Sequence, residues 1–257
     1  MEKTPKLAFE LAGLKIQFDV TVMIMTTITC ILVLLITMLA TRRLALVPTG
    51  MQNLVEMIVE FTQGIVRSNI EGAKTRERFY GFAFSLFLFI FIANQLGLMF
   101  NVVTEHHHPM PALGIEANAH HGGGEGEHNA YAWWKSPTAD INVTLAMAFA
   151  ITIVAHFLGI KRSPKKYASH YFQPFAWMFP LHVIDEIAKP VTHGMRLWAN
   201  IFAGEILIAV LLKGSVLLTG APLIVWLGYS VFVGAIQAYV FTVLAMVYMS
   251  MKLSSDH

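Results

Sequence analysis

The sequence predicts an all-α polytopic membrane protein, with about five transmembrane helices and additional amphipathic or interfacial helices. Three observations carry this prediction: 56% of the 257 residues are hydrophobic, only 13% are charged, and the mean hydropathy is +0.59. An ordinary soluble domain has about 25% charged residues. The net charge of +2 is too small to suggest nucleic-acid binding, and the basic residues form short clusters rather than one face.

Apolar runs of about 20 residues can cross a bilayer as helices. The first three expected spans are Val20–Thr41, Phe79–Val103 and Ile141–Ile160. The first run ends in Arg42 and Arg43 and lacks a small-residue cleavage site. This pattern indicates a membrane helix that is retained, rather than a signal peptide.

The remaining predicted helices are amphipathic or paired. Residues 49–66 carry apolar side chains at spacings of three and four, which favours a helix on the inner membrane surface or on a partner there. Residues 172–189 contain two prolines and an Asp-Glu pair, which favours a separate interfacial helix. Residues 191–219 and 222–251 should form an antiparallel hairpin, with its tight turn at Thr219–Pro222.

Lysines and arginines concentrate in the connections that are expected on the inner side of the membrane. These residues are Arg42, Arg43, Lys74, Arg76, Arg78, Lys161, Arg162, Lys165, Lys166 and Lys252. The long connection 104–138 holds a single lysine, Lys135, and residues 1–19 balance their charges. Both segments are therefore expected outside, which predicts an outer N-terminus and a cytoplasmic C-terminus.

The outer connection is rich in histidine and glycine. It contains "EHHHPM" and "AHHGGGEGEH", which together hold six of the eleven histidines. A metal site needs convergent ligands that are held rigidly, and this tract has no fixed ligand spacing, so we expect weak or no physiological metal binding and no cofactor. The sequence has no Walker A loop, HExxH or GxSxG motif, so the chain is not expected to be an enzyme by itself.

The expected helix 191–219 contains three polar residues, Arg196, Asn200 and Glu205. A charged arginine at the centre of a span costs about 2.5–3.5 kcal/mol on insertion scales, which makes it a functional candidate. Nine residues turn a helix by 900°, so Arg196 and Glu205 point to opposite sides about 13.5 Å apart along the axis. Asn200 shares the face of Arg196 but cannot neutralise it. Arg196 must therefore face water, another helix, or a carboxylate on another chain.

Other polar residues are expected on the neighbouring segments. Asp185 and Glu186 are spaced to pair with Lys189. Ser230 and Gln237 are seven residues apart and share nearly one face of the last helix. A buried Gln can bond between helices or line a wet path. A fixed cation on one side of a helix and a titratable carboxylate on the other suit two separate aqueous routes, with the cation as the barrier between them.

Four stretches resemble the a subunit of the F-type ATP synthase membrane sector in its bacterial form. They are "RLWANIFAGE" (196–205), "GAIQAYVFTVLAMVYMS" (234–250), "KSPTADINVTLAMA" (135–148) and "PTGMQNLVE" (48–56). The resemblance implies a proton-conducting stator subunit in the cell membrane, beside a rotating ring of c subunits that the long hairpin faces. Peripheral-stalk b subunits, other ATP synthase subunits and membrane lipid are the further implied partners. It implies no site for ATP chemistry in this chain.

The resemblance also implies roles for individual residues. Arg196 matches the essential arginine that meets the ring carboxylate and separates two offset half-channels. Glu205, Asn200 and Gln237 match polar positions near the outer route. Possible further half-channel residues are Asn94, Asp140, Asp185, Glu186, Lys189, His193 and Ser230.

Two positions depart from the family pattern. Ser230 stands where some members have a histidine facing the acidic residue, so a Glu–His relay is not available. His193 stands one turn before Arg196, where an apolar residue is common, and is either a neutral, hydrogen-bonded histidine or an extra group near the inner route. Two other classes of membrane protein are possible. A secondary transporter is expected to have internal repeats of its spans, which this sequence lacks. A structural scaffold leaves the cost of burying Arg196 unexplained.

Overall fold

The computed structural model of the chain describes residues 5–11, 14–42, 44–99, 103–105, 130–164, 167, 176–214 and 216–253. The helices are α1 (Val20–Thr41), α2 (Met51–Asn69), α3 (Ala73–Met99), α4 (Ile141–Arg162), α6 (Phe179–Leu212) and α7 (Val216–Leu253), with short 3-10 turns η2 (Pro137–Ala139) and η3 (Ala176–Met178). Two antiparallel strand pairs complete it: β1 (Lys6–Leu11) with β2 (Leu14–Asp19), and β3 (Val103–Glu105) with β4 (Ala130–Ala132).

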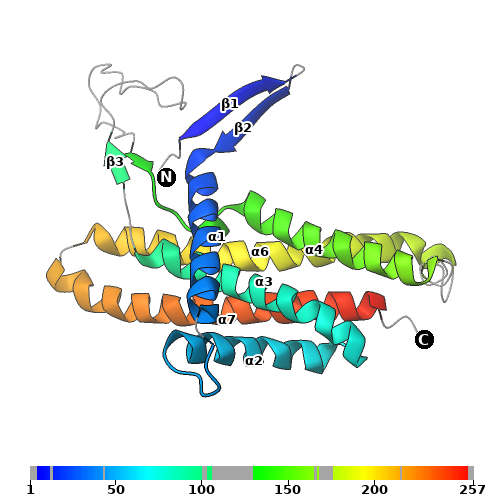
Figure 1. The fold of residues 1–257 in the computed structure, drawn as a ribbon. Helices are drawn as coiled ribbons and strands as arrows, with labels where there is room; N and C mark the ends of the chain where they lie inside the picture. The colour runs from blue at the N-terminus through cyan, green and yellow to red at the C-terminus, as the bar shows by residue number, and fades with distance from the viewer. Residues whose placement is uncertain are drawn as a thin grey trace.

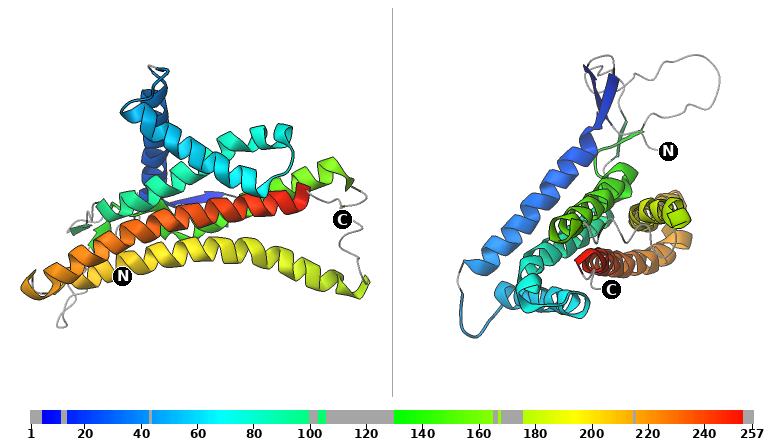
Figure 2. Two further views of the ribbon diagram at one scale, coloured as in Figure 1. Left: turned by 90° about the horizontal axis from the view of Figure 1, so that it is seen from below. Right: turned by 90° about the vertical axis from the view of Figure 1, so that its right-hand side faces the viewer.

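Five of these helices are long and apolar enough to cross a membrane, so the predicted fold class is confirmed. Helices α3, α4, α6 and α7 pack beside one another, and α6 and α7 form the expected antiparallel hairpin (Figure 1). Helix α1 stands across this group, and α2 lies along α3 and α7 (Figures 1 and 2). The core lies where apolar side chains of α3, α4, α6 and α7 meet, and Ile65 and Val66 of α2 pack into it.

Two aspartates fix the starts of membrane helices. The Asp19 carboxylate accepts a hydrogen bond from the backbone N–H of Val22 at 3.2 Å, where α1 begins. The Asp140 carboxylate accepts from the N–H groups of Asn142 and Val143 at 2.7 and 3.4 Å, where α4 begins. These caps satisfy donors that a helix leaves unpaired in its first turn.

The expected division between an interfacial helix (172–189) and a hairpin helix (191–219) is wrong, because α6 runs without a break from Phe179 to Leu212. Residues 168–175 lie outside the described part. Pro190 lies inside α6 and is buried. A proline removes one backbone hydrogen bond and bends a helix without ending it when packing supports both sides. Helix α6 is visibly curved (Figure 2, left).

The expected turn at Thr219–Pro222 is also wrong. These residues belong to α7, and the chain reverses at Lys213 and Gly214 instead. The N–H groups of Lys213 and Gly214 bond to Val210 and Leu211 carbonyls, each at 3.2 Å, in a tightened last turn of α6. Gly and Pro favoured a turn by composition, but the apolar residues on both sides of them continue the helix.

Candidate functional site

Arg196 lies midway along α6 with its side chain exposed. Within the described ranges it makes no ion pair and no hydrogen bond, neither with Glu205 nor with any other residue. The prediction that its counter-charge is not local agrees with this geometry. An arginine with no partner among the described residues fits a counter-charge that comes from water or from another molecule.

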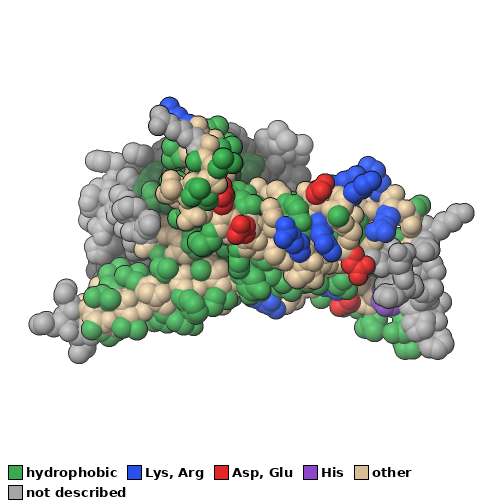
Figure 3. Space-filling model, turned by 60° about the horizontal axis from the view of Figure 1, so that its bottom comes forward, with side chains coloured by type: hydrophobic (Ala, Val, Ile, Leu, Met, Phe, Trp, Pro, Cys, Tyr) green, Lys and Arg blue, Asp and Glu red, His purple; other side chains and the backbone are tan. Residues whose placement is uncertain are grey.

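The surface around Arg196 is apolar. On α6, Met195, Ile206 and Val210 expose 38%, 44% and 58% of their surface. On α7, Phe232 and Ile236 expose 62% and 43%. The hairpin end of the molecule is mainly hydrophobic in Figure 3, whereas Lys and Arg side chains gather toward the opposite end. Arg196 therefore lies exposed near these apolar side chains, with exposed Thr192 and Asn200 as its polar neighbours on the same side of α6.

Asn200 and Gln237 connect the two helices of the hairpin. The Asn200 side-chain amide donates a hydrogen bond to the Gln237 side-chain oxygen at 3.0 Å. Gln237 is only 4% exposed, while Asn200, one turn beyond Arg196, remains exposed. This bond between α6 and α7 matches one of the two expectations for Gln237, a hydrogen bond between helices, and it lies on the side of α6 that carries Arg196.

Glu205 lies on the other side of α6, half-buried against α3 and the η2 segment. Its carboxylate accepts a hydrogen bond from the backbone N–H of Ser136 at 3.1 Å. It fits there because position 97 is a glycine: a Cβ built on Gly97 would lie 2.5 Å from the Ser136 Cβ and 2.9 Å from the Glu205 carboxylate. The structure therefore separates Glu205 from Arg196, as the helix arithmetic predicts.

A buried chain of hydrogen bonds extends from the Glu205 position to the last helix. The Ser136 hydroxyl donates to the Ala93 carbonyl at 2.8 Å and lies 2.7 Å from the Thr138 hydroxyl, which donates to the Asn94 side-chain oxygen at 2.6 Å. The Asn94 amide then donates to the Gly234 carbonyl at 2.9 Å. Ser136, Thr138 and Asn94 are each 0% exposed. Sequence reasoning gave no role to Ser136 or Thr138, although both stand in the quoted "KSPTAD" stretch.

Two other candidates lie near this cluster without joining it. Asp140 caps α4, where its carboxylate accepts hydrogen bonds from backbone N–H groups of that helix. Ser230 is buried on α7, and its hydroxyl has no hydrogen-bond partner among the described residues. A Cβ built on Gly204 of α6 would lie 3.9 Å from the Ser230 oxygen, so the two helices approach closely there.

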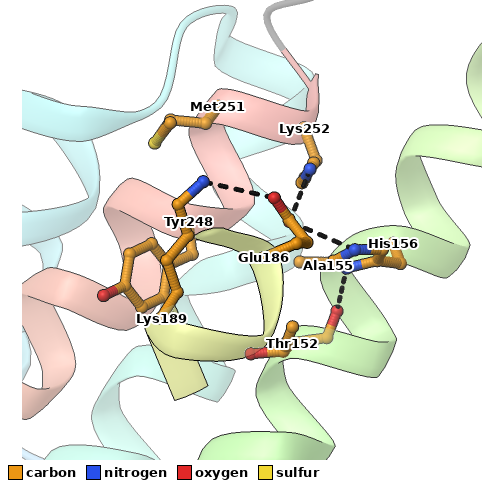
Figure 4. A pocket seen from close by; sticks show the side chains of 8 residues that line it. All are labelled: Thr152, Ala155, His156, Glu186, Lys189, Tyr248, Met251 and Lys252. Carbon is orange, nitrogen blue, oxygen red and sulfur yellow. Dashed lines mark hydrogen bonds and ion pairs between the residues drawn. The ribbon is translucent and has the colours of Figure 1, made fainter. Parts of the chain in front are cut away.

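A second polar cluster centres on Glu186, where α4, α6 and α7 meet (Figure 4). The Glu186 carboxylate lies 2.6 Å from Lys252 Nζ, 3.2 Å from Lys189 Nζ and 3.1 Å from His156 Nε2. Lys189 also pairs with Asp185 at 2.9 Å. The predicted pairing of Lys189 with both acidic residues is confirmed.

The contributions of His156 and Lys252 were missed because they come from distant positions of the sequence. These side chains line one small pocket. Its lining residues are Thr152, Ala155, His156, Glu186, Lys189, Tyr248, Met251 and Lys252. Glu186, Lys189 and His156 keep 15%, 25% and 27% of their side chains exposed, so solvent reaches the cluster.

His193 lies on α6 between this pocket and Arg196. It is 3% exposed, and its ring contacts those of Phe241 and Tyr248, with centroids 3.8 and 5.5 Å away. Neither ring nitrogen has a hydrogen-bond partner among the described residues. The reading of His193 as a hydrogen-bonded structural histidine is therefore wrong: aromatic rings surround it where a polar partner was expected.

Among the described residues no group of three or more His, Cys, Asp or Glu side chains could hold a metal ion. Most of the His- and Gly-rich connection, residues 106–129, lies outside the described part. Its expected weak or absent metal binding therefore stays a prediction.

Comparison with known proteins agrees with the resemblance seen in the sequence. The family described as "ATP synthase A chain" matches residues 23–250. The chain is 43% identical over 251 residues to the ATP synthase subunit a of Anoxybacillus flavithermus, covering 94% of this chain and 95% of that one. It is 40% identical over 262 residues to that of Macrococcus caseolyticus, covering 99% of both. A match of this extent and order shows that the chain belongs to the ATP synthase A chain family.

Proposed function

We propose that this chain is the proton-translocating stator subunit of a bacterial F-type ATP synthase, in the plasma membrane. It supplies two offset half-channels beside a rotating ring of c subunits and couples proton flow to ATP synthesis or hydrolysis elsewhere in the complex. The single observation that carries this proposal is Arg196, an exposed cation near apolar side chains of a membrane helix that makes no ion pair with any described residue. A moving carboxylate on each ring subunit supplies the missing counter-charge.

The two polar clusters supply the two routes. The outer route contains Glu205 and the buried hydrogen bonds through Ser136, Thr138 and Asn94, with Asn200 and Gln237 beside it. The inner route contains the solvent-accessible pocket around Glu186 and Lys189, with His193 beyond it. They lie on different sides of α6, so a proton crosses only by riding the ring, and Arg196 blocks a direct leak between them.

The assignment of outer and inner sides follows the basic residues. Arg42, Arg76, Arg162 and Lys252 stand at helix ends that the positive-inside rule assigns to the cytoplasm. The N-terminus is then outside and the C-terminus inside. Protons driven inward protonate a ring carboxylate near Glu205, travel with the ring, and leave past Arg196 through the inner route. The apolar face of the hairpin contacts the ring, and other exposed faces contact lipid and the b subunits.

The test replaces Arg196 by alanine in the complete ATP synthase and measures ATP-driven proton pumping into membrane vesicles. We expect pumping to be lost while the complex still assembles, because no barrier or counter-charge remains for the ring carboxylate. Arg67→Ala, which removes an exposed arginine of α2 that bonds to Gln63, is the matched control and should pump normally. Normal pumping by an assembled Arg196→Ala complex would overturn the proposal.

A further inference from the structure

His193 is a buried titratable group whose position is not explained by stability. Its two ring nitrogens are enclosed by the protein without a hydrogen-bond partner among the described residues. Leaving a buried polar group unpaired costs about 1–3 kcal/mol, and native proteins rarely retain such groups without a reason. An apolar side chain of similar volume would pack against Phe241 without this cost.

The place of His193 along α6 suggests the reason. Glu186, Lys189, His193, Arg196 and Asn200 follow one another at spacings of three and four, so they share a face of about 80°. Glu186 and Lys189 line the pocket, and Arg196 reaches the exposed apolar face. His193 is the polar group between the two ends. Tyr248 joins it to the pocket, because Tyr248 lines the pocket (Figure 4) and its ring centroid lies 5.5 Å from that of His193.

His193 faces groups on three helices, α6, α7 and α4. On its own helix the charged neighbours are Lys189 and Arg196, one turn to either side. On α7 the neighbours are the apolar Phe241 ring and the titratable Tyr248 phenol. On α4, Leu145 and the Thr144 carbonyl pack closely against Gly194, the residue after His193. The titratable His156 of α4 lies in the pocket. No carboxylate among the described residues bonds to His193 and fixes its tautomer.

We propose that His193 is the proton-carrying residue of the inner route, between the ring carboxyl group at Arg196 and the pocket around Glu186. This inference rests on the proposed function and deepens it. The protonated ring carboxylic acid gives its proton to one nitrogen of neutral His193, and the resulting carboxylate pairs with Arg196. The imidazolium then releases a proton from its other nitrogen to water in the pocket, which restores neutral His193.

The surrounding charges favour onward transfer of the proton. The fixed guanidinium of Arg196 repels an imidazolium one turn away, so the proton does not rest on His193. The ring carboxylate that has just lost its proton is held by Arg196 and does not readily take it back. In the opposite direction of rotation, the same two nitrogens carry a proton from the pocket to the ring.

The test uses the complete complex in vesicles and measures passive proton conduction through the membrane sector, together with its dependence on the pH of the inner side. His193→Leu removes both nitrogens, and His193→Gln keeps a polar group that cannot titrate. General acid–base groups contribute about 10²–10⁴-fold, so we expect at least about a tenfold loss for His193→Leu. Both variants should also lose a titration step from the pH profile. His182→Leu, which removes another histidine of α6, is the matched control and should conduct normally.

The outcomes separate this inference from the proposed function. The role of His193 alone would be overturned if Arg196→Ala loses pumping while the His193→Leu and His193→Gln complexes keep normal conduction and a normal pH profile. Normal pumping by Arg196→Ala would overturn the proposed function itself. Failure of both His193 variants to assemble would identify a structural residue and would also overturn the inference. Loss of conduction with a changed pH profile in assembled His193→Gln supports it.

Discussion

Arg196 has a charge that no other residue in the described part of the chain neutralises. A lysine could lose its proton in an apolar environment, whereas a guanidinium stays charged. Its side chain is exposed on a face formed by Met195, Ile206 and their neighbours. Such a position is costly in lipid alone, and becomes favourable when a carboxylate of another subunit pairs with it.

Glu205 is expected to carry protons on the outer route. Glu205→Gln keeps an oxygen that can accept the Ser136 N–H bond but removes the titratable group. We therefore expect assembly to be retained and passive proton conduction to fall at least about tenfold, as is usual when an acid–base group is removed. Glu60→Gln, on the exposed surface of α2, is the matched control. Unchanged conduction in assembled Glu205→Gln complexes would remove Glu205 from the route.

At the scale of residues, the sequence predicted the side-chain directions and pairings that are set within a single helix. The opposite directions of Arg196 and Glu205, and the pairing of Lys189 with its acidic neighbours, follow from 100° per residue. The same rule could not predict the partners of Glu205 and Glu186 that lie on other elements. Ser136 and Lys252 meet these carboxylates from 69 and 66 positions away along the chain, and no local pattern encodes that contact.

At the scale of elements, α6 presents two different polar sides to its neighbours, and each side contributes to one of the two proposed routes. The side with Glu186, His193 and Asn200 faces α7, and the side with Glu205 faces α3 and η2. A curved helix of this length can pack against both groups at once. The two routes are therefore separated by the body of one helix rather than by a loop.

The contact of α3 with this second side depends on Gly97. Gly97→Ala should push Ser136 and Glu205 apart, because the new methyl group would lie 2.5 Å from the Ser136 Cβ. Overpacking of this kind typically costs about 1–3 kcal/mol, so we expect lower thermal stability and slower proton conduction. Gly81→Ala in the same helix is the control, since a Cβ there meets nothing within 4 Å and alanine favours a helix. Equal stability and conduction of the two variants would contradict this packing argument.

The sequence predicted where helices end less well than it predicted that those helices exist. Pro190 and the Thr219–Pro222 stretch indicated ends of helices by composition, yet α6 and α7 continue through them. Packing of neighbouring helices holds a proline-containing helix together, and that packing cannot be read from a local window. The strand pairs β1–β2 and β3–β4 were also not expected, although Leu14–Asp19 of β2 alternates apolar and polar residues in the way that is typical of a strand.

At the scale of the whole molecule, the lengths and tilts of the helices matter as well as the number of membrane spans. Helices α6 and α7 have 34 and 38 residues, longer than the roughly 20 that a bilayer requires. Their excess length implies tilt or extension beyond the lipid. Helix α1 stands across them (Figure 1). Hydrophobicity predicted five spans, but their tilts depend on contacts between helices, which the sequence does not display.

The central claim is that the α6 face around Arg196 lies against the moving ring, and disulfide cross-linking in the assembled complex tests it most directly. Cys30, which is exposed, is first replaced by serine. Ala203→Cys then places a thiol on the exposed Arg196 face of α6, and Ile153→Cys places one on α4, where Ile153 is 66% exposed. Disulfides form only when the Cα atoms approach within about 7 Å.

The partner cysteine is introduced into each ring subunit beside its membrane carboxylate. We predict that Ala203→Cys forms a disulfide with the ring upon oxidation and stops ATP-driven pumping until the bond is reduced, while Ile153→Cys does neither. Cross-linking of the ring to Ile153→Cys but not to Ala203→Cys would contradict the account.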